Sequence, residues 1–264
     1  MESPRTYTNF IDGAWTESTT RETFENRNPA DRDDLVGRFQ KSGPEDVNRA
    51  VASAKKALPA WRAMPAPRRA EMLYRLGQIL MDRKEALARD MTREMGKVLN
   101  ETRGDVQEAI DTAFYAAGEG RRMFGETVPA ELPNKWAMSM RVPVGVCGLI
   151  TPWNFPMAIP SWKTFPALVA GNTVVLKPAS DTPGSAHHLV EVLVDAGVPE
   201  GVVNIVHGGG STVGTPIVLH PDVKMISFTG SSEVGKVIAE RSAKSLKRVS
   251  LELGGKNAQI VMED

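Results

Sequence analysis

The hydrophobic pattern of the chain divides it into a helical first half and an alternating second half. In the first half, apolar residues recur every three or four positions over segments that we predict as helices, at 44–58, 67–87 and 101–122. We expect Ser42 to be the N-cap of the first helix and Pro59 to end it. Ahead of the helices, the segment 10–15 surrounds an Asp-Gly pair and predicts a short β-hairpin.

In the second half, short apolar and β-branched runs alternate with amphipathic stretches. The predicted strands are 144–150, 173–176, 202–206, 225–228 and 249–253. The stretches between them are compatible with helices, at 157–170, 185–196, 212–219 and 233–242. Strands that are apolar throughout and alternate with helices form a parallel sheet covered on both faces. The expected fold class is therefore α/β, with a doubly wound, mostly parallel sheet. Residues 118–136 fit neither pattern and predict an excursion out of the main domain.

The composition excludes several classes of protein. Lys and Arg total 32 and Asp and Glu total 32, so a nucleic-acid binder that neutralises phosphates is not expected. The longest apolar run, 142–150, is shorter than the roughly 18 residues of a membrane span, and the first ten residues do not form a secretory signal. The one cysteine, Cys147, excludes an internal disulfide and a thiolate zinc site. We therefore expect a cytoplasmic protein without a metal site or a membrane partner.

Candidate chemistry is expected just after the strands, because open parallel sheets bind ligands at the carboxyl ends of their strands. Asn154 follows the first predicted strand, where its amide can donate to a developing oxyanion without titrating. The alternative is an Asx turn or a helix cap, which is the commoner use of an isolated asparagine. Lys177 follows the second predicted strand and can reach a ribose hydroxyl or a phosphate, but it could also be a surface lysine at a turn.

Glycine-rich turns follow the next two strands. The turn at 207–214 departs from G-x-G-x-x-G because Val213 takes the place of the third glycine. The turn at 229–236 offers free N–H groups at a helix N-terminus to a pyrophosphate, unless its serines only cap that helix. At the last strand end, Glu252 lies between two leucines and is a candidate general base, since a desolvated carboxylate accepts a proton more readily. A salt bridge with a nearby lysine is the alternative.

Taken together, the segments ITPWNFP, LKPAS, the 207–214 turn, FTGSSEVG and LELGGKN resemble the aldehyde dehydrogenase superfamily in order and approximate spacing. The resemblance covers essentially the whole chain, but only about the first half of a family enzyme. It implies a Rossmann-like sheet in which Asn154 is the oxyanion donor, Lys177 contacts the adenosine ribose and Glu252 is the general base. The other residues that it implies for the dinucleotide site are Ile150, Thr151, Pro152, Trp153, Ser180, Gly210, Gly230, Ser231, Val234 and Leu253.

The resemblance also implies the cofactor and the partners. Many family members that prefer NAD carry a glutamate where this chain has Ser180. A carboxylate repels a 2′-phosphate and a serine does not, so we expect NADP to be accepted alongside NAD. The excursion at 118–140 resembles the family's oligomerisation arm, which predicts a homo-oligomer for the full-length protein.

Four parts are expected on this basis. Residues 1–117 would form the N-terminal part of the cofactor-binding domain, 118–140 the arm, 141–252 the Rossmann-like NAD(P)-binding core and 253–264 the start of a truncated catalytic domain. The family's nucleophilic cysteine would lie about 35 residues beyond Glu252, past the end of this sequence, and Cys147 is expected to be a small core residue.

The predicted function is that of the cofactor-binding half of an NAD(P)-dependent aldehyde dehydrogenase, inactive by itself. The whole enzyme would oxidise an aldehyde, with semialdehydes among the candidates, to a carboxylic acid through a cysteine thioester. One alternative is a truncated paralogue that binds a dinucleotide without catalysis, although such a protein needs neither Asn154 nor Glu252. Another is an acylating relative, which commonly lacks the general base.

Overall fold

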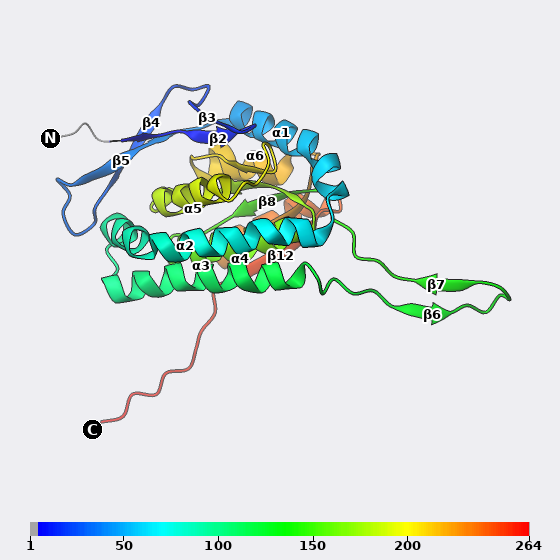
Figure 1. Ribbon diagram of the computed structural model, residues 1–264. Coiled ribbons are helices and arrows are strands. Elements are labelled where there is room, and N and C mark those ends of the chain that lie inside the picture. Colours follow the sequence, from blue (N-terminus) through cyan, green and yellow to red (C-terminus); the bar gives the residue numbers. More distant parts are fainter. Residues whose placement is uncertain (1–4, 264) are drawn as a thin grey trace.

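The computed structural model describes residues 5–263, and a seven-stranded sheet forms its centre (Figure 1). The strand order is β12-β11-β8-β9-β10-β2-β3, and the first five of these strands are parallel. Their bounds are β8 (Val146–Ile150), β9 (Thr173–Lys177), β10 (Val203–Ile205), β11 (Val223–Gly230) and β12 (Arg248–Leu253). The predicted α/β class with a mostly parallel sheet is confirmed.

Alternate residues of the strands face two separate cores, which is why the strands are apolar throughout. Cys147 and Leu149 pack with α2 (Ala66–Met95), α3 (Leu99–Glu119), α4 (Ala158–Val169) and α5 (Pro183–Asp195). Val146 and Ile150 face α1 (Pro44–Ala63), α6 (Thr215–Leu219) and α7 (Ser232–Ala243). Helices therefore cover both faces, as a doubly wound sheet requires. The edge strand β12 is the exception, since all of its residues are exposed or half-buried.

The predicted hairpin adds two antiparallel strands, β2 (Asn9–Ile11) and β3 (Ala14–Thr16), to the other edge of this sheet. Asp12 and Gly13 both have positive φ, 54° and 81°, as the tight turn of a two-residue hairpin requires. A second small sheet, which the polar sequence did not reveal, contains β1 (Thr6–Tyr7), β4 (Thr23–Arg27) and β5 (Leu35–Gln40).

Two expectations about α1 were wrong. Its N-cap is Gly43 rather than Ser42, and the side chain of Asp46 accepts hydrogen bonds from the Gly43 N–H and the Ser18 hydroxyl. Pro59 lies inside the helix instead of ending it. The last turn buries Trp61, whose indole N–H donates to the Leu168 carbonyl at 3.2 Å, and this tertiary contact outweighs the disfavour of an internal proline.

The second helix, predicted over 67–87, extends further, because α2 ends at Met95. The third helix is shifted, because α3 begins at Leu99 and ends at Glu119. The segment predicted as one helix over 212–219 begins earlier, with a π-helical turn, η1 (Gly210–Gly214), before α6.

The predicted excursion is a two-stranded antiparallel arm, β6 (Thr127–Pro129) and β7 (Trp136–Met138), that extends away from the body (Figure 1). Its apolar side chains are exposed, including Val128 and Trp136. Among the helices formed by residues 5–263, none is both long and apolar enough to cross a bilayer.

Candidate functional site

The carboxyl ends of the parallel strands meet along one edge of the sheet. Ile150, the last residue of β8, is paired with Lys177 of β9 on one side and with Phe228 of β11 on the other. Further along the same edge, Thr229 is paired with Glu252. The segments that follow these strands therefore lie side by side, although they are far apart in the sequence.

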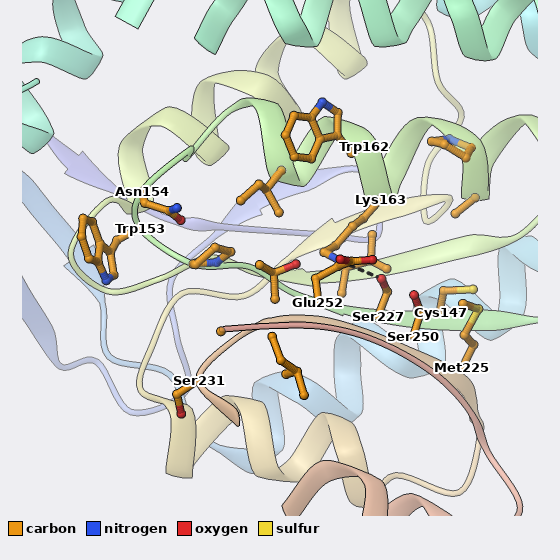
Figure 2. A pocket seen from close by; sticks show the side chains of 18 of the residues that line it. Cys147, Trp153, Asn154, Trp162, Lys163, Met225, Ser227, Ser231, Ser250 and Glu252 are labelled. Atoms are coloured by element: carbon orange, nitrogen blue, oxygen red, sulfur yellow. Dashed lines mark hydrogen bonds between the residues drawn. The ribbon is translucent and has the colours of Figure 1, made fainter. Parts of the chain in front are cut away.

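A pocket of about 1070 Å³, here called the larger pocket, lies between α4 and the strands β8, β11 and β12, and it extends from Met225 to this carboxyl edge (Figure 2). Asn154 and Trp153 lie at one end of it, and Glu252 lies toward the middle (Figure 2). The predicted site residues that line it are Pro152, Trp153, Asn154, Gly230, Ser231, Glu252 and Leu253.

A second pocket of about 150 Å³, the smaller pocket, lies between α6 and α7. Its walls are mainly apolar, and its charged side chains are those of Lys177 and Arg241. The predicted site residues that line it are Ile150, Lys177, Gly210 and Val234. The predicted site residues are therefore divided between two pockets.

The N-terminus of α7 lies between the two pockets. Ser231, which lines the larger pocket, is the N-cap and accepts a hydrogen bond from the backbone N–H of Val234, which lines the smaller one. The serine therefore does cap its helix, as the alternative interpretation proposed. The N–H groups and the dipole of the first helical turn still favour an anion at this position.

Two predicted residues line neither pocket. Thr151 is buried, and its Oγ1 has no hydrogen-bond partner within residues 5–263. The Ser180 hydroxyl donates to the carbonyl of Gly208 at 3.2 Å, so it contacts the glycine-rich turn two residues before Gly210. Ser180 itself lines a separate pocket of about 270 Å³, together with Trp153 and Thr182.

Lys177 is buried at the inner wall of the smaller pocket, with 5% of its surface exposed. Its ammonium donates to the Pro178 carbonyl, and burial lowers its pKa from 10.5 to about 8. The alternative of a surface lysine is therefore wrong. A buried cation beside apolar walls suits a ligand that has both a flat apolar group and an anionic or hydroxyl-rich group.

The environment of Glu252 differs from the expected one, because its side chain is exposed and not buried between leucines. β12 is the edge strand of the sheet, so the carboxylate points into an open pocket. Lys163 of α4 lies nearby and donates to the Ser227 hydroxyl at 2.9 Å (Figure 2). Burial lowers the pKa of Lys163, and the negative charge of Glu252 opposes that shift. Within the described residues Glu252 forms no ion pair, so the salt-bridge alternative is not observed.

Cys147 is buried on β8, and burial raises its pKa to about 12. It lines the far end of the larger pocket from Asn154 (Figure 2). Its surroundings are those of a core residue, as expected. Within residues 5–263, no three His, Cys, Asp or Glu side chains are grouped to hold a metal ion.

Sequence patterns did not reveal three residues from the helical part of the chain that support the site. Lys163 is on α4, and Lys97 and Asp105 contact the loop between β8 and α4 from the α2–α3 region. Lys163 and Asp105 occupy ordinary helix positions and Lys97 lies in the short link between α2 and α3, so only the packing of the helices brings them to the site.

The fold and the two pockets define an α/β protein with a ligand site at the carboxyl edge of a Rossmann-like sheet. The family model "Aldehyde dehydrogenase family" matches residues 15–264, and the chain belongs to that family. It is 44% identical over 259 residues to alpha-ketoglutaric semialdehyde dehydrogenase of Bacillus subtilis (strain 168), covering 98% of this chain and 53% of that protein.

A second relative and a solved structure support the same family membership. The chain is 43% identical to succinate-semialdehyde dehydrogenase [NADP(+)] of Escherichia coli (strain K12), covering 96% of this chain and 52% of the relative. The crystal structure of an E. coli NADP-dependent enzyme superposes with a TM-score of 0.92 at 42% identity, covering 95% of this chain and 52% of that one. The chain spans about half the length of the curated relatives it matches.

Proposed function

We propose that this chain supplies the cofactor-binding part of an NAD(P)-dependent aldehyde dehydrogenase. The observation that carries the proposal is the division of its predicted site residues between two pockets on either side of the α7 N-terminus. A dinucleotide has the matching shape, with two nucleosides joined by a pyrophosphate, and helix N-termini favour phosphate groups.

The smaller pocket would hold the adenosine. Val234 would pack against the adenine ring, the backbone of Gly210 would allow close approach, and Lys177 would donate to the ribose. The space beside Gly210 supports the close approach of a ligand to its backbone, because a Cβ placed on Gly210 would meet no atom within 4 Å. Ser180 contacts the glycine-rich turn that leads to Gly210 and brings no charge that would repel a 2′-phosphate, so we propose that NADP binds alongside NAD.

The larger pocket would hold the nicotinamide and the aldehyde. The bound cofactor would accept a hydride from the substrate. The Asn154 amide would donate to the oxyanion of the tetrahedral intermediates, and the Glu252 carboxylate would take a proton from the water that releases the acid. The buried Cys147 thiol does not fit the part of the nucleophile, which another cysteine of the whole enzyme would supply.

The substrate proposed is a semialdehyde, because the relatives named above act on alpha-ketoglutaric and succinate semialdehyde. We also propose that the exposed arm formed by β6 and β7 pairs with another copy in a homo-oligomer. A non-catalytic dinucleotide-binding paralogue has less support, because Asn154 and Glu252 share the larger pocket, and binding alone needs neither.

Titration of the chain with NADPH, followed by its fluorescence, tests the proposal. Lys177→Met is expected to weaken binding about 10- to 100-fold, as for the loss of a hydrogen bond to a charged group. The matched control is Lys224→Met, which removes an exposed lysine at the amino end of β11 and is expected to change the Kd less than about twofold. Absence of NADPH binding, or equal effects of the two substitutions, would contradict the proposal.

A further inference from the structure

We propose that Lys97 and Asp105 are positioning residues for Asn154. They hold the loop of residues 151–157, between β8 and α4, from the α2–α3 region of the molecule. The inference rests on the proposed role of the Asn154 amide as an oxyanion donor. Neither residue lines the larger pocket, so each would act through the loop and not on the substrate.

The direction of the Asn154 amide depends on the backbone of this loop. Asn154 is exposed, and within the described residues its side chain forms no hydrogen bond. The loop is fixed after β8 by the Thr151 N–H, which donates to the Lys177 carbonyl at 3.1 Å. The Trp153 carbonyl then accepts from the Thr182 hydroxyl at 3.4 Å. These contacts restrain the first half of the loop but not the peptide that follows Asn154.

Lys97 restrains that peptide. It comes directly after Gly96, whose left-handed conformation with φ 79° ends α2 and turns the chain toward the loop. The Lys97 ammonium donates to the backbone carbonyl of Asn154 at 2.6 Å and lies 3.7 Å from the centre of the Phe155 ring. A hydrogen bond from a charged donor and a cation–π contact therefore hold two consecutive residues of the loop.

Asp105 restrains the other end of the loop. It is fully buried on α3, and its Oδ1 accepts from the backbone N–H groups of Met157 at 3.3 Å and Ala158 at 2.7 Å. The carboxylate thus satisfies N–H groups at the start of α4 and places a negative charge at the positive end of that helix.

The contact between Asp105 and the start of α4 depends on pH, because it depends on the negative charge of Asp105. Burial raises its pKa to about 6, Lys97 opposes the shift, and Glu108 of the same helix adds to it. Its Oδ2 has no hydrogen-bond partner within residues 5–263. The anchor therefore loses its charge in mildly acidic solution, at a pH where most carboxylates stay ionised.

Hydrogen exchange of the chain without cofactor tests the role of Lys97. The Ile159 N–H donates to the Phe155 carbonyl at 3.1 Å, so its exchange reports on the loop. Lys97→Met is expected to speed exchange at Ile159 and Ala158 about 10- to 100-fold and to leave β9 unchanged. The matched control is Lys55→Met, which removes a lysine that bonds Asp222 at 2.8 Å, and it is expected to change neither. Unchanged exchange in Lys97→Met would overturn the role of Lys97.

The NMR signal of the Asn154 side-chain amide tests Asp105 with a readout that a purely structural role would not move. In the wild-type chain that signal is expected to shift with a midpoint near pH 6, and in Asp105→Asn the shift is expected to vanish. A shift that persists in Asp105→Asn, or no shift in the wild type, would overturn the role of Asp105. Both measurements are made without cofactor. Failure of the proposed function would instead appear as absence of NADPH binding, so the two failures can be distinguished.

Discussion

The Cys147 thiol is expected to be chemically inert in the folded chain. It is 2% exposed, and its pKa is raised to about 12 by burial. At pH 8, a thiol with that pKa is about 0.01% thiolate, whereas an unperturbed thiol with a pKa of about 8.5 is about 25% thiolate. Since only the thiolate attacks an electrophile, ionisation alone slows alkylation about 2,000-fold, and steric exclusion of the reagent slows it further.

Alkylation of the native chain by iodoacetamide, measured by mass spectrometry, checks this value. The matched control is Ser245→Cys in a Cys147→Ala background, because Ser245 is exposed at the end of α7. Urea should restore ordinary reactivity to Cys147, and the rate in the native chain should rise about tenfold per pH unit toward pH 12. Alkylation of native Cys147 as fast as that of the control would refute the reasoning and would restore Cys147 as a candidate nucleophile.

Ser180→Glu is expected to weaken NADP+ binding at least about tenfold and NAD+ binding less than about twofold, because a carboxylate repels the 2′-phosphate. Calorimetric titration with both cofactors checks this, and equal losses would contradict it. Asp46→Ala is expected to lower the free energy of unfolding in urea by about 2–4 kcal/mol, since the Ser18 hydroxyl and the Gly43 N–H lose their acceptor. A change below about 0.5 kcal/mol would argue against that network. NADPH affinity should fall as the pH rises through about 8, where Lys177 loses its proton. Lys177→Arg should flatten that pH profile, because arginine keeps its charge. A wild-type affinity that does not change with pH would contradict the role of the ammonium.

The sheet and the edge that carries the site could be predicted from the sequence for a physical reason. Strands buried on both faces leave apolar runs without alternation, and each run ends where the polar or glycine-rich turn begins. Lys177 and Gly230 were therefore located by their positions directly after such runs. The resemblance to the aldehyde dehydrogenases added roles to these positions.

The features that the sequence did not reveal depend on tertiary contacts. Pro59 stays helical because Trp61 is buried by α4, and Lys97 and Asp105 reach the site only because α2 and α3 pack beside the 151–157 loop. Glu252 is exposed because β12 is an edge strand, which its own apolar run does not indicate. Likewise, the N-terminus of α7 lies between two pockets, a division that the positions of the residues after the strands do not indicate.

Chemical-shift mapping with cofactor fragments tests most directly whether one dinucleotide spans both pockets. We predict that 2′,5′-ADP shifts the amide signals of Gly210 and Val234, that nicotinamide mononucleotide shifts those of Asn154 and Leu253, and that NADP+ shifts both groups together. Shifts confined to one pocket with NADP+, or located away from the carboxyl edge of the sheet, would contradict the account.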